Sequence, residues 1–365
     1  MKVAITGGHG FLGWHTACRL RARYGVDAVR LGRADLADPD RLSEALDGVD
    51  TVLHLAGVNR AETDDEVEGG NVALAEAVSS ALSGRPVHVV YSNSVHQGLD
   101  TPYGRGKRRA GEILRCLPGT TADVALPNLF GEHGRPAYNS FVATFCHEVA
   151  SGRVPEVQVD REVPLLHAQA AAQALIDSAL ERVDGTREVA GESHRVSDVL
   201  ATVRHFHTLY ADRGEVPDLT ASFAVDLFNT YRSYRFPESF PIHADVHADD
   251  RGRLFETVRS HGGTGQAFVS TTAPGRGRGE HYHLRKVERF FVVAGQAEIS
   301  LRRLLHDDVV TFRLSGDRPA FVDMPTLWVH ALTNVGDDDL VTMFWADQLL
   351  DPDDPDQYPE EVRSR

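Results

Sequence analysis

The chain has few cysteines and no long apolar run. Its 365 residues contain three cysteines, Cys18, Cys116 and Cys146, which are scattered, odd in number and without CxxC spacing. That pattern predicts reduced thiols in a cytoplasmic protein rather than a disulfide framework. No apolar run approaches the roughly 18 residues that a membrane span needs, so no contact with a membrane is expected. The opening residues Met1–Ile5 pass directly into a strand-like run, and no signal peptide is expected either.

Basic residues are also in short supply. The 38 Lys and Arg are outnumbered by 53 Asp and Glu, which gives a formal net charge of −15. A phosphate backbone would be repelled by this charge, so a nucleic-acid partner is disfavoured. A nucleotide ligand remains compatible, because it needs only a local cluster of N–H groups and one or two arginines. The apolar and charged fractions, 42% and 25%, are ordinary for globular proteins, and the length suits two domains.

Two kinds of pattern divide the sequence. Up to about residue 210, apolar runs alternate with amphipathic stretches, which predicts an α/β Rossmann-type, doubly wound parallel sheet with helices on both faces. The helical signal then fades, and a linker is predicted between about Thr230 and His243. Beyond it, short β-branched and aromatic runs broken by Gly, Asp and Pro predict an all-β barrel. The predicted domains are therefore 1–242 and 243–365. The expected strands include 3–6, 27–31, 51–55, 87–92 and 123–127, then 266–272, 289–293, 297–301, 308–312 and 340–345; the expected helices include 14–23, 73–82 and 107–117.

A glycine-rich turn follows the first expected strand and opens a helix. Its glycines are Gly7, Gly10 and Gly13, with Phe11 and Leu12 between the last two. The first glycine permits a tight turn, the second lets the backbone approach a pyrophosphate, and the third allows close packing of helix on strand. The helix N-terminus then offers free N–H groups to the phosphates. These five residues are predicted to bind a dinucleotide.

The end of the second strand indicates which nicotinamide cofactor is preferred. Where an acidic residue would bind the ribose 2′-hydroxyl of NAD, the sequence has Gly32 and Arg33. An arginine at this place can pair with a 2′-phosphate, which favours NADPH. Asp35 and Leu36 are then expected along the adenine. Alternatively, Arg33 is only a solvated surface residue.

A YxxxK pattern supplies candidate reductase chemistry. Tyr103 and Lys107 are spaced i, i+4, so both lie on one face of a helix. The lysine cation is expected to lower the pKa of the phenol towards neutrality, which would let Tyr103 give a proton to a carbonyl oxygen. Ser94, with Ser92 as second choice, closes a strand at the carboxyl edge of the sheet and is expected to hold the substrate oxygen.

Taken in order, the glycine turn, the segment His54-Leu55-Ala56-Gly57, and the Ser, Tyr and Lys set resemble the extended short-chain dehydrogenase/epimerase family over roughly the first 230 residues. The resemblance implies that Leu55, Ala56 and Gly57 contact the cofactor, as do Tyr103 and Lys107. It also implies further roles for three residues: Asn71 braces strands near the catalytic tyrosine, Asn128 contacts a nucleotide sugar, and Arg161 binds the substrate diphosphate. Two departures stand out. The stretch before Thr51 looks short by one helix–strand pair, and Ala168-Gln169-Ala170 replaces an acidic pair.

The second half contains a candidate metal site. In the pattern HxH, His281 and His283 share one face of a strand because side chains repeat every two residues. Together with Glu288, and with Gly275 and Gly295 on either side, they have the spacing of the first cupin motif. His330 lies in a segment that resembles the second cupin motif, although Pro319 and Leu327 replace its glycines. Three His and one Glu suit Zn, Fe, Mn or Ni with an open position for substrate.

Over nearly its whole length the chain resembles the CapF family of capsular polysaccharide assembling proteins. The stretches that carry this resemblance are His54–Arg60, Pro127–Gly131, Tyr138–Ser140 with Thr144–Cys146, Asp249–Gly252 and Asp351-Pro352. Composition alone would make the acidic C-terminal end a solvated tail, whereas the resemblance favours a tail that docks on the fold. A further stretch, Asp250–Glu256, resembles the entry strand of cupin-fold sugar 3,5-epimerases.

This resemblance implies two reactions on a UDP- or TDP-linked 4-keto-6-deoxy amino sugar. A divalent metal in the cupin, zinc in the family, would assist inversion at C3, and NADPH would then reduce the C4 ketone with Tyr103 as proton donor. A homodimer is also implied. Two alternatives remain open: a nucleotide-sugar epimerase or dehydratase that retains NAD and carries a purely structural cupin, and a non-catalytic sensor of metal, sugar or redox state.

Overall fold

The computed structural model describes residues 2–363, which form two compact units. The first unit contains the chain through Phe130, together with Ala137–Ser140 and Val159–Val196. The second contains Gly131–Pro136, Phe141–Gln158 and the chain from Ser197 onward. The chain therefore crosses between the units several times before the barrel begins. The boundary at residues 242 and 243 stays a prediction, since helices that precede it in sequence group by contacts with the barrel.

A parallel six-stranded sheet forms the centre of the first unit, in the order β2-β1-β3-β4-β5-β8. Among the described residues β2 is the outermost strand beside β1, and only short helices separate it from β3, so the predicted trimming of one helix–strand pair is confirmed. The strands are β1 Val3–Thr6, β2 Val29–Leu31, β3 Thr51–His54, β4 His88–Ser94, β5 Thr121–Leu126 and β8 Gly185–Glu188.

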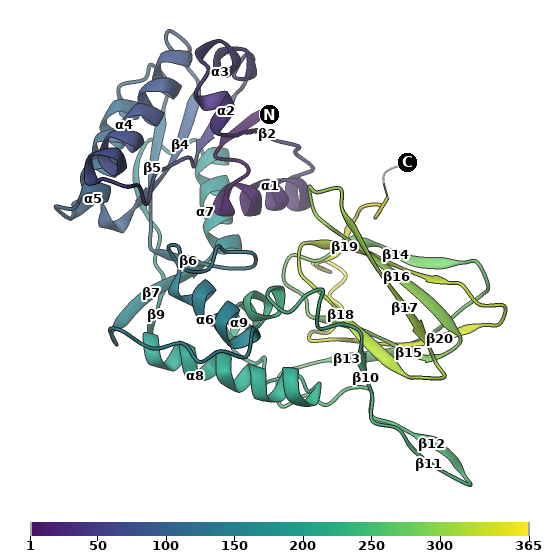
Figure 1. Cartoon of the computed structure of the whole chain (residues 1–365). Coiled ribbons are helices and arrows are strands. Elements are labelled where there is room, and N and C mark those ends of the chain that lie inside the picture. Colours follow the sequence, from purple (N-terminus) through teal and green to yellow (C-terminus); the bar gives the residue numbers. More distant parts are fainter. Residues whose placement is uncertain (1, 364–365) are drawn as a thin grey trace. The chain divides into compact units, whose positions relative to one another are not determined.

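Helices cover both faces of this sheet. Figure 1 shows α4 and α5 on one face and α1 and α7 on the other. Helix α4 begins at a capping box in which Thr63 and Glu66 satisfy each other's backbone N–H groups. Helix α5 begins behind a Thr101 cap, with Pro102 at its first position. The helices are α1 Phe11–Tyr24, α2 Arg33–Leu36, α3 Pro39–Ala45, α4 Asp64–Ala81, α5 Pro102–Arg115 and α7 Ala168–Leu180, and η1 Val95–Gly98 is a 3-10 turn.

The first unit also contains a smaller, three-stranded sheet. It consists of β6 Asn128–Phe130, β7 Glu162–His167 and β9 Glu192–Arg195, with β6 parallel and β9 antiparallel to β7. The residues that replace the family's acidic pair open α7 directly after β7, and the helix runs to Leu180. Gln169 donates to the His15 ring on α1, at 2.9 Å from Nδ1, which ties the two helices together.

The second unit is built around two five-stranded antiparallel sheets that face each other (Figure 1). Their buried interior includes Phe290, Phe291, Ile299 and Leu332. This arrangement confirms the predicted fold class, a Rossmann-type α/β unit followed by an antiparallel β domain. The first sheet has the order β10 Ile242–His243, β18 Ala320–Met324, β15 Glu288–Ala294, β20 Leu340–Ala346 and β13 Gln266–Thr272; the second has β17 Val309–Ser315, β16 Gln296–Arg303, β19 Trp328–Asn334, β14 Gly277–Tyr282 and β21 Tyr358–Pro359.

Helices and one hairpin complete the second unit. Figure 1 shows the hairpin of β11 His247–Asp249 and β12 Gly252–Leu254 projecting from the barrel, and all its strand residues are exposed. The helices are α6 Phe141–Ala150, α8 Val196–Phe206 and α9 Ser222–Ser233, with one π-helical turn at His207–Ala211.

The linker predicted between about Thr230 and His243 is wrong. Helix α9 continues through Ser233, and beyond it Phe236 and Phe240 are buried. The Phe236 ring packs edge-on against Trp328, with 4.7 Å between ring centroids. The sequence also predicted that helices end near Tyr210, which is wrong because α9 lies beyond that residue. The aromatic residues and prolines of the segment look like a connector, but burying its rings against the barrel makes it part of the core.

The acidic C-terminal end docks on the second unit. Strand β21 pairs with β14, and the Asp356 carboxylate accepts hydrogen bonds from the backbone of residues 284–286. The chain from Asp356 onward therefore docks, as the family resemblance implied, whereas residues 351–354 are exposed, as expected from composition alone.

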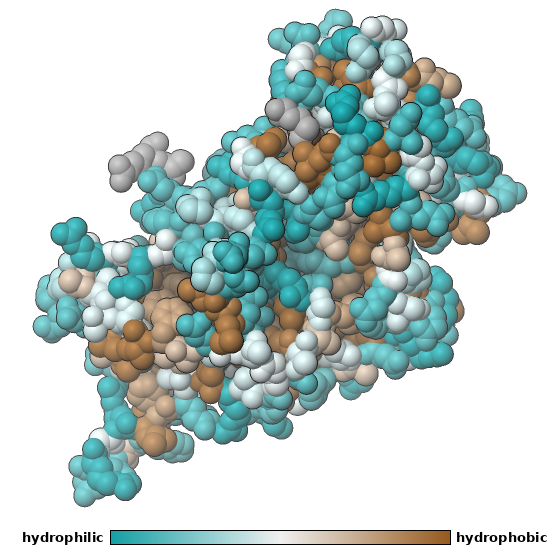
Figure 2. All heavy atoms as spheres, turned by 180° about the vertical axis from the view of Figure 1, so that it is seen from behind, coloured by the Kyte–Doolittle hydropathy of each residue, from teal (hydrophilic) through white to brown (hydrophobic). Residues whose placement is uncertain are grey.

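The outer surface is largely polar. On the face drawn in Figure 2, hydrophilic residues predominate and apolar ones form small patches. The three cysteines are free, Cys18 and Cys146 buried and Cys116 exposed, as expected for reduced thiols. No helix among residues 2–363 combines the length and apolarity that crossing a membrane would require.

Candidate functional site

The glycine-rich turn between β1 and α1 leaves no room for a Cβ at Gly7, Gly8 or Gly13. Gly7 has a φ of +68°, and a Cβ there would lie 2.9 Å from Cα of Ala56. A Cβ at Gly13 would lie 2.1 Å from the Gly7 carbonyl oxygen. Gly10 caps α1 without a side-chain hydrogen bond, and Phe11 and Leu12 in the first turn are partly exposed. The first helical N–H groups are therefore suited to receive an anion.

Replacing Gly13 with alanine is expected to weaken binding of the nicotinamide cofactor by about 5–150-fold, because the added methyl group must displace the turn and overpacking costs about 1–3 kcal/mol. Gly69 in the interior of α4 provides the matched control, since a Cβ there meets no atom within 4 Å. Gly69→Ala is expected to keep the wild-type affinity. Fluorescence titration with NADPH measures both variants. Equal affinity in the two would contradict the role of close helix–turn packing.

The segment after β3 lies against the glycine turn and helix α5. The Ala56 backbone N–H donates to Oγ1 of Thr6, and the Leu55 N–H donates to the Thr6 carbonyl. A Cβ at Gly57 would lie 3.9 Å from Nζ of Lys107. The structure thus brings the predicted cofactor contacts of β1, β3 and α5 to one edge of the sheet, the carboxyl edge where α/β proteins bind ligands.

Asn71 braces the loop after β3, whereas the family resemblance implied that it braces strands. Its amide nitrogen donates to the carbonyls of Val58 and Val67, both at 2.7 Å. Its amide oxygen accepts from the Val58 N–H at 3.2 Å. The side chain is buried on α4, so it fixes the loop after β3 to that helix.

The end of β2 carries the residues predicted to select the cofactor. Arg33 is exposed at the start of α2, and the Asp35 carboxylate accepts from the Gly32 N–H at 2.8 Å. Asp35 therefore stabilises the turn that presents Arg33. Leu36 packs against the apolar core of the unit. Their contacts with a cofactor stay predictions.

Tyr103 and Lys107 lie one turn apart on α5, and Lys107 is buried. Its ammonium group donates to the Ser92 carbonyl at 2.6 Å and lies 4.3 Å from the centre of the Tyr91 ring. Burial lowers the pKa of Lys107 to about 7, although the charge of Asp123 opposes that shift. This lysine can therefore exist in both charge states near neutral pH.

The expected lowering of the Tyr103 pKa is wrong for this structure. Burial raises the pKa of the phenol, and the interaction with the Ser94 hydroxyl offsets only part of that rise. Sequence spacing placed the lysine one turn away but could not weigh desolvation against charge. The phenol consequently keeps its proton at neutral pH, which is the form that a proton donor requires.

A buried polar network beneath Ser94 was not predicted. The Asp123 carboxylate on β5 accepts from Nδ2 of Asn93 at 2.7 Å and from Arg115 at 3.0 Å. In turn, Oδ1 of Asn93 accepts from the Ser94 N–H at 2.8 Å. Gly111 leaves space for this carboxylate, since a Cβ there would lie 2.7 Å from Oδ2 of Asp123. The signal was present on α5, where Gly111 and Arg115 continue the i, i+4 spacing of Tyr103 and Lys107.

The residues predicted to bind substrate lie on or beside the smaller sheet. Asn128 begins β6, and its amide donates to the Pro164 carbonyl at 3.4 Å. Arg161 directly precedes β7 and is exposed. Neither contact with a substrate is tested, so both roles stay predictions.

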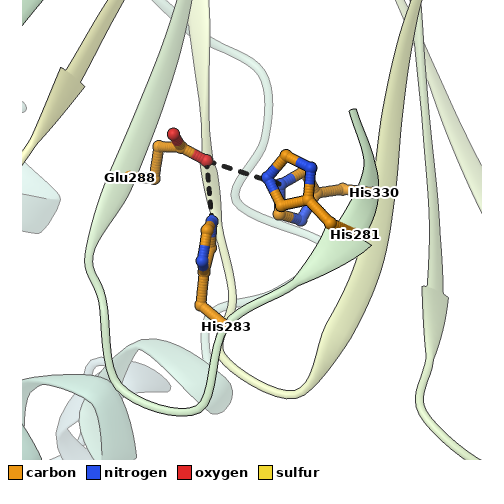
Figure 3. Close-up of side chains that lie close together, drawn as sticks. All are labelled: His281, His283, Glu288 and His330. Atoms are coloured by element: carbon orange, nitrogen blue, oxygen red, sulfur yellow. Dashed lines mark hydrogen bonds and ion pairs between the residues drawn. The ribbon is translucent and has the colours of Figure 1, made fainter. Parts of the chain in front are cut away.

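In the second unit the four predicted metal ligands converge. One ligand atom each from His281, His283, Glu288 and His330 lie within 4.8 Å of one another. Figure 3 shows Glu288 between His283 and His330, with Oε2 at 2.9 Å and 3.4 Å from their Nε2 atoms. Nε2 of His281 lies 3.2 Å from Nε2 of His330, which it faces across the pairing of β14 with β19.

The electrostatics of this cluster suit a cation. Burial, together with the charges of the neighbouring imidazoles, lowers the pKa of His281 to about 3. Burial also lowers the pKa of His330. Burial would raise the pKa of Glu288, but the charges of His283 and His330 and their hydrogen bonds hold it well below its usual range. Two neutral imidazoles facing each other through their nitrogens, beside a carboxylate, have excess lone pairs that a divalent metal would satisfy.

Both halves of the chain match known protein families. Residues 3–188 match the NAD dependent epimerase/dehydratase family, and residues 247–358 match the polysaccharide biosynthesis C-terminal domain. The chain is 32% identical to a UDP-2-acetamido-2,6-beta-L-arabino-hexul-4-ose reductase of Pseudomonas aeruginosa over 373 residues, which cover 98% of each chain.

Solved structures also resemble this chain. Capsular polysaccharide assembling protein CapF from Staphylococcus aureus superposes with a TM-score of 0.63 and 31% identity, covering 99% of this chain and 100% of that one. A UDP-N-acetylglucosamine 4-epimerase from Methanobrevibacter ruminantium, at 17% identity and a TM-score of 0.55, shares the fold over 64% of this chain and 97% of its own.

Proposed function

Because the chain belongs to the NAD dependent epimerase/dehydratase family and, over its full length, to the CapF family, we propose that it is a bifunctional nucleotide-sugar enzyme. The proposed substrate is a UDP-linked 2-acetamido-2,6-dideoxy-4-ketohexose. The second unit would invert C3 with the help of a metal, and the first would reduce the C4 ketone with NADPH. The observation that carries the proposal is the presence, in one chain, of a Ser–Tyr–Lys set at the edge of a Rossmann-type sheet and a buried three-His, one-Glu cluster.

The chemistry of the ketone sets the order of the two reactions. A C4 carbonyl makes the neighbouring C3–H acidic, since the carbanion formed on loss of that proton is stabilised as an enolate. Reduction converts the carbonyl to an alcohol and removes this activation. Epimerisation must therefore precede reduction.

In the reductive half, a bound nicotinamide would supply hydride to C4. Tyr103 would then give its phenolic proton to the C4 oxygen, and the Ser94 hydroxyl would hold that oxygen in place. The raised pKa of Tyr103 supports this direction of transfer, because it keeps the phenol protonated. Lys107, anchored on the Ser92 carbonyl, would stabilise the phenolate left behind and orient the cofactor.

In the epimerising half, His281, His283, Glu288 and His330 would hold the metal, which would polarise the C4 ketone and stabilise the enolate. The buried cluster excludes bulk water from three of its four members. Tyr282, which lies between His281 and His283 in the sequence, is not proposed as the base. Strand alternation places it on the face opposite to the two histidines, and its buried ring faces Tyr358 at 5.5 Å between centroids.

A panel of keto-sugar nucleotides tests the proposal directly. Purified protein with zinc and NADPH is expected to oxidise NADPH when given a UDP- or TDP-linked 4-keto-6-deoxy amino sugar. If no member of the panel caused NADPH oxidation, the proposed substrate class would be wrong. Tightly retained NAD with no net consumption would favour the epimerase or dehydratase alternative with a structural barrel.

The cofactor preference rests on Arg33. Arg33→Asp is expected to lower kcat/KM for NADPH by about 10–100-fold, the value of losing one or two charge-assisted hydrogen bonds to the 2′-phosphate, while NADH is used no worse. Arg41, an exposed arginine on α3, provides the control, and Arg41→Ala should change neither cofactor. An unchanged ratio of the two cofactors in the Arg33→Asp variant would mean that Arg33 is only solvated.

A further inference from the structure

The acidic C-terminal segment contacts a predicted metal ligand through its backbone. Nδ1 of His283 lies 2.5 Å from the carbonyl oxygen of Asp356. A carbonyl can only accept, so the ring must carry its proton on Nδ1. Nε2 then faces Oε2 of Glu288 and the centre of the cluster, so it is the nitrogen that would bind a metal, in place of the proton that it donates to the carboxylate.

The Asp356 side chain holds the loop that joins two of the ligands. Its carboxylate accepts from the backbone N–H groups of Leu284 at 2.9 Å, Arg285 at 2.9 Å and Lys286 at 2.7 Å. These residues lie between His283 and Glu288. One carboxylate therefore fixes the backbone that sets the spacing of both side chains.

Several other contacts keep Asp356 in this position. The buried Lys286 ammonium group donates to the Pro355 carbonyl at 2.5 Å. Further along, β21 pairs with β14 so that Pro359 lies opposite His281. Arg302 then binds the carboxylate of Glu360 at 2.7 Å and the carbonyls of the two residues that follow.

Asp356 is also held in a conformation that side chains rarely adopt. Its φ is +44°, a value at which most residues other than glycine are strained and Asp is better tolerated. Such conformations persist where the surroundings over-determine them, and they gather at functional sites. The neighbouring Asp353, in contrast, is exposed on the same acidic stretch.

We propose that Asp356 is a positioning residue of the metal centre: its carbonyl fixes the tautomer and orientation of His283, and its carboxylate fixes the loop between His283 and Glu288. The inference rests on the proposed metal-binding function. It assigns the docked tail a role in metal affinity, beyond closing the edge of a sheet. Partners that orient metal ligands in this way are worth about 10–100-fold in affinity.

Asp356→Gly tests the inference, because glycine accepts the positive φ and keeps the carbonyl while removing the carboxylate. Asp353→Gly is the matched control, with the same change on the same tail. In the full-length protein, zinc affinity is measured by competition with a chromophoric chelator, and the ligand geometry by the visible absorption of the cobalt-substituted protein. We expect Asp356→Gly to bind zinc about 10–100-fold more weakly and to shift the cobalt spectrum, and Asp353→Gly to match the wild type.

Unchanged zinc affinity and cobalt spectrum in Asp356→Gly would overturn the inference while leaving the metal site intact. A wild-type protein that binds no zinc or cobalt would instead overturn the metal site itself, and the inference with it. If Asp356→Gly does not fold, Asp356→Asn replaces it, since the amide keeps one acceptor oxygen. That variant should lose affinity in the same direction, and wild-type affinity in it would equally contradict the positioning role. NADPH affinity, expected to be unchanged in all three variants, verifies that the first unit is intact.

Discussion

Replacing Tyr103 with phenylalanine is expected to lower NADPH-dependent reduction of the 4-ketosugar nucleotide by about 10²–10⁴-fold, the usual contribution of a positioned proton donor. The substitution removes only the phenolic oxygen, so the ring still fills its place on α5. Loss of NADPH absorbance gives the rate. The same variant should still exchange the C3 hydrogen with deuterated solvent, because that reaction is assigned to the four-ligand cluster of the second unit.

Tyr24→Phe is the matched control. Tyr24 is partly exposed at the end of α1, where its hydroxyl accepts from Gln173, and nothing assigns it to the chemistry. We expect wild-type reduction and exchange from this variant. If Tyr103→Phe reduced the substrate at the wild-type rate, another group would have to donate the proton. If it lost exchange as well as reduction, the two reactions would not belong to separate sites.

Replacing His281 with alanine is expected to abolish solvent exchange at C3, with a loss of at least about 10²-fold, because the enolate would lose the charge that stabilises it. His281 is the least buried of the four ligands, so its removal leaves the rest of the cluster packed. Exchange is followed by NMR in deuterated water. Reduction of a substrate that already has the inverted C3 configuration should continue, since Tyr103, Lys107 and Ser94 are unchanged.

The exposed His247 on the projecting hairpin provides the control, and His247→Ala should exchange normally. Removing the metal from the wild type with a chelator should abolish C3 exchange, as in the His281 variant. Added zinc should restore exchange in the chelated wild type but not in the variant. Continued exchange in the His281 variant, or in the metal-free protein, would mean that the cluster is structural and that the base acts without a metal.

Patterns of neighbouring residues correctly predicted several strands and helices. Strands β1 and β13 begin and end at the residues expected from their apolar runs, and α5 carries the YxxxK pair on one face. The four residues of the candidate metal cluster were found because HxH has the period of a strand and Glu288 and His330 fall at motif spacing. These inferences need only neighbours along the chain or a resemblance to known motifs.

Contacts between distant segments could not be obtained in this way. Helix α9 was missed because its aromatic residues are explained only by their burial against the barrel. The contacts of Asp356 lie about seventy residues back along the chain, and no pattern in the acidic tail distinguishes it from Asp353. The shift of the Tyr103 pKa was predicted with the wrong sign for a related reason. Spacing reveals a nearby charge, whereas burial depends on the whole fold.

In the proposed function, one chain first activates C3 through the ketone and then reduces that ketone with Tyr103 as donor. The most direct measurement uses NADPH carrying deuterium at both nicotinamide C4 positions, with the 4-ketosugar nucleotide in ordinary water, and then the mirror experiment with unlabelled NADPH in deuterated water. NMR of the product should place deuterium at C4 in the first experiment and at C3 in the second. A product without cofactor deuterium at C4, or one labelled at neither carbon, would contradict the account.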